Sequence, residues 1–162
     1  MGVNRGKQFE EQVRDAFDRL DDVSVIRLID PQNGFAGVRN ICDFVVYHNP
    51  HQYLIECKSC YGNTLSFNNI TDGQWNGLLE GSKVDGVIAG VLIWFIDHDK
   101  TIFVPIQILE RMKKAEFKSV NIKSLSEDMY YVVPGRQRRV LFDYDFTSFL
   151  KKGRYLIDEM PL

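Results

Sequence analysis

The sequence predicts an α/β fold in which a mixed β-sheet is flanked by helices. Amphipathic stretches with helical spacing alternate along the chain with short apolar and β-branched runs, which is the order expected when helices pack against a sheet. Residues 41–47 and 52–58 are two such runs around a turn-forming cluster at 48–51, as in a β-hairpin. Residues 87–96 are apolar almost throughout, which is typical of a strand covered on both faces.

Length and composition are those of a soluble globular protein. The 162 residues are enough for one domain (1–162) with a substantial core, and 26% of them are charged. No apolar run approaches the roughly 20 residues of a membrane span, and the N-terminus lacks the apolar region of a secretory signal. We therefore expect a cytoplasmic protein without a membrane partner. The cysteines at 42, 57 and 60 make neither an even disulfide set nor a zinc-ligand pattern.

Charge is unevenly distributed along the chain. The net charge is −2, but residues 111–154 carry eleven Lys/Arg against five Asp/Glu, a balance of +6. The remaining residues carry nine against seventeen, a balance of −8. A basic C-terminal third is what a nucleic-acid-binding protein needs to neutralise phosphates. The alternative interpretation of this feature alone is a solvated charged surface.

The N-terminal residues 5–20 have the pattern of an amphipathic helix, with Asn4 as its N-cap. At about 100° per residue, Glu10 falls roughly 75° from the centre of the apolar stripe and Glu11 falls almost opposite it. Glu10 is thus expected at the edge of the core, where it can reach a site at the end of the sheet, and Glu11 in solvent. The alternative for Glu10 is a solvated flank position.

A β-branched strand is predicted at 23–29, followed by an irregular loop at 30–40 that is rich in glycine and polar residues. Loops of this kind that lead into a site are often functional. Arg39 is a candidate phosphate contact, and Gln32, Asn33 and Phe35 could meet a DNA backbone or base. The alternative is a surface loop with an incidental arginine.

The hairpin carries only three charged residues within its apolar runs: Asp43, Glu56 and Lys58. Burying charge among strand residues is costly unless the charges meet one another or a metal. Glu56 and Lys58 are two apart and leave the same face of their strand, and pairing across the hairpin brings Asp43 close. Two carboxylates and an ammonium then converge, which is suitable for holding a divalent cation and polarising a phosphodiester. The alternative is an ordinary hairpin with salt-bridged edge charges.

The rest of the chain continues the alternation. A helix at 71–82 is capped by Thr71 or Asp72 and has Gln74 on the edge of its apolar face. The predicted order then is strand 87–96, turn 97–100, strand 101–104, helix 105–112, a polar segment 115–128, strand 130–133, basic loop 135–139, strand 140–144 and helix 145–152. The basic loop holds three candidate DNA contacts: Arg136, Arg138 and Arg139.

The spacing Asp-x12-Glu-x-Lys on consecutive strands resembles the core of the PD-(D/E)XK nucleases, a mixed sheet flanked by helices. That resemblance implies that Asp43 and Glu56 bind Mg²⁺, for which Mn²⁺ could substitute, with help from the main-chain carbonyl of Cys57. It also implies that Lys58 orients water or steadies the charge that develops on the phosphate.

Several blocks in order resemble the RecU-type Holliday junction resolvases more closely. They are Asn4-Arg5-Gly6-x-x-Phe9-Glu10, Cys42-Asp43-Phe44, Leu54-Ile55-Glu56-Cys57-Lys58-Ser59, Leu65-Ser66-Phe67 with Gln74, and the apolar run at 86–95. The resemblance covers about residues 4–110, with a looser echo at Phe142-Asp143-Tyr144. It implies that Glu10 and Gln74 support the metal or water, and we add Arg5 to the expected DNA contacts.

The family acts as a homodimer that cleaves two opposed strands of a four-way DNA junction. Its members carry a long stalk between the first strand and the catalytic Asp, whereas here only about eleven residues, 30–40, fill that place. The sequence therefore predicts a metal-dependent endonuclease that resolves branched DNA in recombination. Two alternatives stay open: a structure-tolerant, restriction-like or nicking nuclease on the same site, and a DNA- or partner-binding protein that retains the fold.

Overall fold

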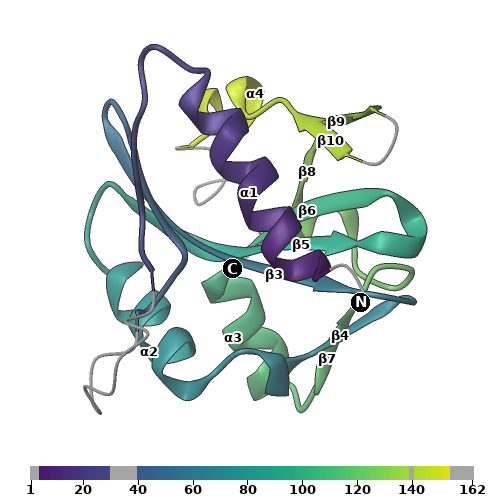
Figure 1. The fold of residues 1–162 in the computed structure, drawn as a ribbon. Coiled ribbons are helices and arrows are strands. Elements are labelled where there is room, and N and C mark those ends of the chain that lie inside the picture. The colour runs from purple at the N-terminus through teal and green to yellow at the C-terminus, as the bar shows by residue number, and fades with distance from the viewer. Residues whose placement is uncertain (1–3, 30–39, 139–140, 154–162) are drawn as a thin grey trace.

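The computed structural model describes residues 4–29, 40–138 and 141–153, and its centre is a six-stranded mixed sheet in the order β1-β2-β3-β5-β6-β8 (Figure 1). The sheet strands are β1 (Ser24–Arg27), β2 (Phe44–His48), β3 (His51–Cys60), β5 (Val87–Phe95), β6 (Lys100–Pro105) and β8 (Tyr131–Val133). Two further ribbons are β4 (Thr64–Ser66) with β7 (Ser119–Asn121), and β9 (Gly135–Arg138) with β10 (Leu141–Tyr144). The helices are α1 (Arg5–Asp18), α2 (Asp72–Gly81), α3 (Ile106–Lys114) and α4 (Thr147–Lys151), with 3-10 turns η1 (Phe67–Asn69), η2 (Ile96–His98) and η3 (Glu127–Met129).

The sheet separates two layers of helices. Helices α1 and α4 and the β9–β10 ribbon lie on one face, and α2, α3 and the β4–β7 ribbon lie on the other (Figure 1). Strand β3 pairs antiparallel with β2 and parallel with β5, and α2 lies in the connection between β3 and β5. Strand β3 therefore has a paired strand at each edge and a layer of helices on each face.

Alternation along β3 assigns its side chains to these two layers. Tyr53, Ile55 and Cys57 belong to the apolar cluster beneath α1, whereas Leu54 belongs to the cluster beneath α2. Because side chains alternate along a strand, Glu56 and Lys58 project on the same side as Leu54. Glu56 and Lys58 thus face the α2 layer.

Two helix starts follow from local capping. The Asn4 side chain accepts the Lys7 N–H at 3.2 Å, and α1 then buries Phe9, Val13 and Phe17. Thr71 and Gln74 form a capping box at α2, in which each side chain accepts a backbone N–H of the other residue. The second cap also fixes the Gln74 side chain near the sheet.

The predicted α/β architecture and the strand order around the hairpin are confirmed, with three corrections. The hairpin turn is shorter than predicted, because His48 pairs with His51 and only Asn49 and Pro50 connect the strands. Within the segment 115–128, predicted only as polar, Ser119–Asn121 form β7 and pair with β4. Residues Gly135–Arg138 are a strand and not a loop, since pairing with β10 outweighs the weak strand preference of arginine and glutamine.

Some predicted positions lie outside the described residues: Asn33, Phe35, Arg39, most of loop 30–40, and Arg139. Among the described helices, none combines the length and apolar character that a membrane crossing requires.

Candidate active site

Asp43 lies directly before β2 and is held by the backbone of both neighbouring strands. Its N–H donates to the Ile55 carbonyl at 3.0 Å, and its carbonyl accepts the Leu28 N–H at 2.8 Å. Its side-chain Oδ2 accepts the backbone N–H of Cys57 at 2.7 Å. These contacts fix the Asp43 carboxylate beside the residue that follows Glu56.

Glu56 is 2% exposed and lies between a cation and an amide. Its Oε1 contacts the Lys58 Nζ at 2.8 Å and accepts a hydrogen bond from Gln74 Nε2 at 2.7 Å. The structure thus brings together Asp43, Glu56, Lys58 and Gln74, four of the predicted site residues.

Gln74 is held in place from both ends. Its Nε2 donates to Glu56, while its Oε1 accepts the Thr71 N–H at 3.0 Å as part of the capping box. The side chain has little freedom to leave the carboxylate because the helix start needs it. Gln74 therefore links the first turn of α2 to the buried acid.

Burial raises the pKa of both acids, and the charge of a neighbouring carboxylate adds to the rise in each. For Glu56, desolvation is the main cause, the Asp43 charge adds to it, and Lys58 opposes it. For Asp43, desolvation again raises the pKa, the Cys57 N–H lowers it, and the Glu10 charge raises it. Two adjacent carboxylates that resist ionisation form a site at which an added cation would be stabilised.

Glu10 reaches the same region from the opposite layer. Its charge raises the pKa of both acids, yet its Oε2 pairs with Arg27 Nη2 at 2.7 Å. Arg27 was not predicted as a site residue. The sequence signal was available, since Arg27 is the one charged residue in the apolar strand pattern 23–29.

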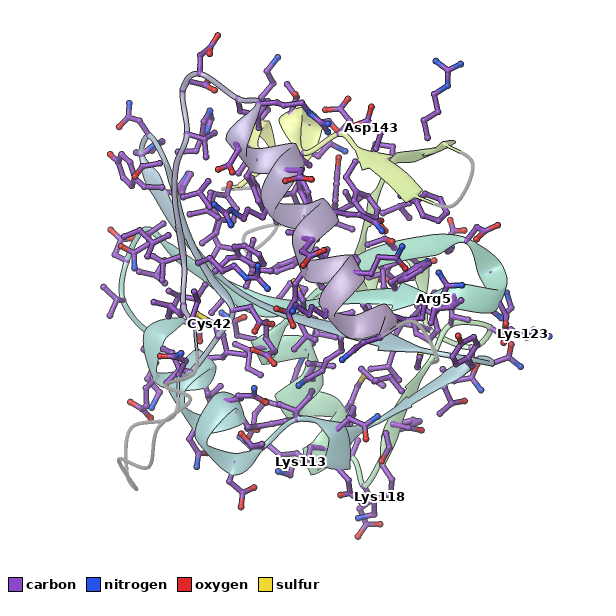
Figure 2. The ribbon with its side chains drawn as sticks, viewed as in Figure 1. Arg5, Cys42, Lys113, Lys118, Lys123 and Asp143 are labelled. Carbon is purple, nitrogen blue, oxygen red and sulfur yellow. The ribbon has the colours of Figure 1, made fainter. Side chains whose placement is uncertain are left out.

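The predicted DNA contacts are only partly placed. Arg5 opens α1 (Figure 2) and donates to Gln8 Oε1 at 2.9 Å. The next residue, Gly6, lies near the Ser59 hydroxyl, one position beyond Lys58. Arg136 is exposed on β9, opposite Asp143 of β10. The backbone of Arg138 lies on the same strand. Arg5 therefore lies near the C-terminal end of β3, and the β9–β10 ribbon lies on the α1 side of the sheet (Figure 1).

Within the part of the chain that the structure describes, no three Asp, Glu, His or Cys side chains form a ready metal cluster. The carboxylates of Asp43 and Glu56 are adjacent, but Glu10 turns to Arg27. Mg²⁺ commonly uses only one or two protein carboxylates together with water and substrate phosphate. The arrangement is thus compatible with a cation that enters with its substrate.

The solved structures that are similar to this chain include a 1.6 Å structure of Archaeoglobus fulgidus Hjc, a Holliday junction resolvase from an archaeal hyperthermophile. The identity is 21%, the match covers 80% of this chain and 91% of that one, and the TM-score is 0.48. No curated protein matches the sequence.

The family model "RecU: Recombination protein U" matches residues 31–146, which is well over half of the chain. The matched range includes Asp43, Glu56, Lys58 and Gln74, the residues that the structure brings together. The chain belongs to the RecU family of Holliday junction-resolving recombination nucleases.

Proposed function

We propose that this protein resolves four-way DNA junctions by Mg²⁺-dependent phosphodiester hydrolysis, with Mn²⁺ as a substitute ion. The observation that carries the metal dependence is the pairing of half-buried Asp43 with buried Glu56 beside Lys58. Both carboxylates offer the hard oxygen donors that Mg²⁺ prefers, and burial raises the pKa of both acids although Lys58 opposes the rise. A divalent cation fits this donor set.

Each residue of the site has a proposed role. Asp43 and Glu56 hold the cation, with the Cys57 carbonyl as a third donor and Glu10 in support. When bound, the cation would polarise the phosphate and lower the pKa of a water molecule. Lys58 steadies the charge that develops on the scissile phosphate, which requires it to exchange Glu56 for the phosphate. The hydrogen bond from Gln74 keeps the Glu56 carboxylate oriented toward the proposed cation site.

DNA is held by residues around this site rather than by the acids. Arg5 lies near the end of β3, and Arg136, Arg138 and Arg139 belong to the β9–β10 ribbon and its turn. Loop 30–40, with Asn33, Phe35 and Arg39, precedes Asp43 in the chain and is proposed to select the shape of the DNA. Alanine at Phe35 and Arg39 should reduce the preference for junctions more than the cleavage rate.

A homodimer is proposed because resolution needs two cuts on opposed strands, whereas one chain supplies one set of Asp43, Glu56 and Lys58. Sedimentation of the protein with and without a junction gives the stoichiometry directly. A strict monomer on the junction would oppose this part of the proposal.

The deciding experiment compares cleavage of a synthetic four-way junction with matched duplex and single strand, in Mg²⁺, Mn²⁺ and EDTA. Paired, symmetric nicks in the junction with metal alone support the proposal. Equal cleavage of all three DNAs would indicate a structure-tolerant nuclease. Junction binding without cleavage under any condition would indicate a binding protein that retains the fold.

A further inference from the structure

A cavity of about 580 Å³ lies on the α2–α3 layer, outside the group of acids. Its walls come from η1, the start of α2, the end of α3 and the segment that follows α3. Lys113 and Lys118 both line it. Figure 2 shows these two lysines near the lower edge of the molecule, away from Arg5. The volume is within the range of small-ligand sites.

The cavity has an aromatic floor and fixed walls. Phe67 meets Trp75 edge to face at 5.3 Å, and the Lys113 ammonium lies 4.3 Å from the centre of the Trp75 ring. The Lys118 carbonyl accepts the Phe67 N–H at 2.9 Å, which ties the opposite wall to η1. The Lys113 ammonium thus lies on the Trp75 ring and the Lys118 backbone is tied to η1, while both lysine side chains stay exposed to a ligand.

Phe117 lies between these lysines in the sequence, lines the cavity and is 57% exposed. The preceding residue, Glu116, has a φ of 66°, so the chain turns sharply after α3 and presents Phe117 outward. Burial in the core does not account for an aromatic side chain here. An exposed aromatic between lysines is the combination that proteins use to stack a base and hold its phosphate.

The lining distinguishes a nucleotide from a simple anion. Asp72 also lines the cavity and would repel a free phosphate. A nucleotide separates its charge from its base, so phosphate can meet the lysines while an amino group of the base meets Asp72 or Asn68. Across residues 111–118 there are four Lys/Arg against one acid, which favours a polyanion.

The cavity is linked to the acids through one side chain. Thr71 is part of its wall, Gln74 Oε1 accepts the Thr71 N–H, and Gln74 Nε2 donates to Glu56. A DNA strand with its scissile phosphate beside Glu56 would need to pass only the first turn of α2 to reach Phe117.

We propose that this cavity binds one unpaired nucleotide of the DNA substrate, with its base on Phe117 and its phosphate between Lys113 and Lys118. The inference rests on the proposed nuclease function and adds a subsite for a frayed or displaced nucleotide.

The test measures anisotropy of a fluorescein-labelled oligo(dA) of about eight nucleotides, within the known site sizes, in EDTA so that nothing is cut. Phe117→Ala and Phe117→Leu should weaken binding about tenfold or more, and Phe117→Tyr should bind like wild type. Lys118→Ala should lower the slope of log K against log salt by about 0.7. The matched control is Lys123→Ala, an exposed lysine that lies outside the cavity.

Equal binding by Phe117→Leu and Phe117→Tyr would overturn base stacking, and an equal slope for Lys118→Ala and Lys123→Ala would overturn the phosphate contact. Competition by millimolar inorganic phosphate as strong as by oligo(dA) would reduce the cavity to an anion site and also overturn the proposal. Cleavage of the junction is scored separately. Wild-type protein that cleaves the junction but does not bind oligo(dA) refutes only this inference, whereas wild-type protein that binds oligo(dA) but does not cleave the junction refutes only the proposed function.

Discussion

Arg27 Nη2 contacts Glu10 Oε2 at 2.7 Å, and this ion pair joins β1 to α1 at the edge of the acidic site. Both side chains are largely buried, with 21% and 28% of their surface exposed. Arg27 thus competes for the carboxylate that would otherwise face Asp43 and Glu56. Because of this competition, the contribution of Glu10 to the metal site depends on its pairing with Arg27.

Glu10→Gln is expected to weaken metal-dependent cleavage, with partial rescue at higher Mg²⁺, because one supporting carboxylate is lost. Losses of about 10- to 100-fold in metal affinity are typical when a supporting group of a metal site is removed. Magnesium titration by calorimetry, with cleavage in parallel, measures the effect. Glu11→Gln is the matched control, since Glu11 is exposed on the same helix. Equal effects of the two changes would reduce Glu10 to a general charge.

Arg27→Met should have the opposite effect on the metal. Removing the guanidinium frees Glu10 and leaves the acids more negative, so less Mg²⁺ should be needed for half-maximal binding. Calorimetry in the absence of DNA reports this directly. Weaker metal binding by the folded variant would show that Arg27 orients Glu10 for the site rather than diverting it.

Lys58→Ala should lower the cleavage rate by about 10²- to 10³-fold while junction affinity stays close to wild type. The reason is that Lys58 acts on charge that develops during the reaction, whereas phosphate affinity comes from the basic surface. Single-turnover kinetics and binding in Ca²⁺ separate the two effects. Lys83→Ala serves as control, because Lys83 is an exposed lysine paired with Glu80. Normal turnover by Lys58→Ala would move the chemistry elsewhere.

The metal-free protein should lose stability as pH rises from about 4 to about 8. Burial raises the pKa of Glu56 to about 8 and that of Asp43 to about 6, above the usual carboxyl values of about 4. In that window the folded state binds more protons than the unfolded state, so unfolding becomes easier as the pH rises. Above a pH of about 8, both acids are ionised in the folded state, and their ionisation no longer changes the free energy of unfolding. Denaturation in urea at several pH values with EDTA measures the slope.

Glu56→Gln should flatten this pH dependence, whereas Glu80→Gln, an exposed change on α2, should not. Saturating Mg²⁺ should also flatten it, because the ion binds the ionised acids of the folded state. An unchanged slope in Glu56→Gln would assign the pH dependence to other groups.

Gly77→Ala should reduce both stability and cleavage. A Cβ at Gly77 would lie 2.6 Å from the Cβ of Ile41, two residues before Asp43, so α2 or the Asp43 segment must move. Overpacking of this kind costs about 1–3 kcal/mol, and it would also stretch the Gln74–Glu56 hydrogen bond. Thermal denaturation and cleavage rates report the two effects. Gly73→Ala is the control: its Cβ meets only Thr71 Oγ1 at 4.0 Å, so alanine there should be neutral or stabilising.

The hairpin and the residues converging on Glu56 could be predicted because they depend on local pattern. Period-two alternation places Glu56 and Lys58 on one face whatever surrounds them, and the capping preference of Thr71 fixes where α2 begins. The helical spacing of residues 5–20 also placed Glu10 near the edge of the core, where its side chain pairs with Arg27.

The remaining features depend on contacts between distant segments. Strand β9 is held by its partner β10, and β4 by β7, so their own residues carry little signal. The ion pair of Arg27 with Glu10 joins two elements whose relative angle the sequence does not encode locally. The cavity is likewise formed by η1 and the end of α3, which approach each other only after the sheet has assembled.

The antiparallel pairing of β2 with β3 has a consequence for the order of folding. Asp43 and Glu56 meet within one short hairpin, whereas Gln74 comes from α2, in the long crossover between the parallel strands β3 and β5. Local contacts generally form earlier than pairings across a long crossover. The repulsion between the Asp43 and Glu56 carboxylates therefore mainly lowers the folding rate. The hydrogen bond from Gln74 to Glu56 mainly lowers the unfolding rate. Neutralising an acid should accelerate folding, and loss of the Gln74 amide should shorten the lifetime of the folded state.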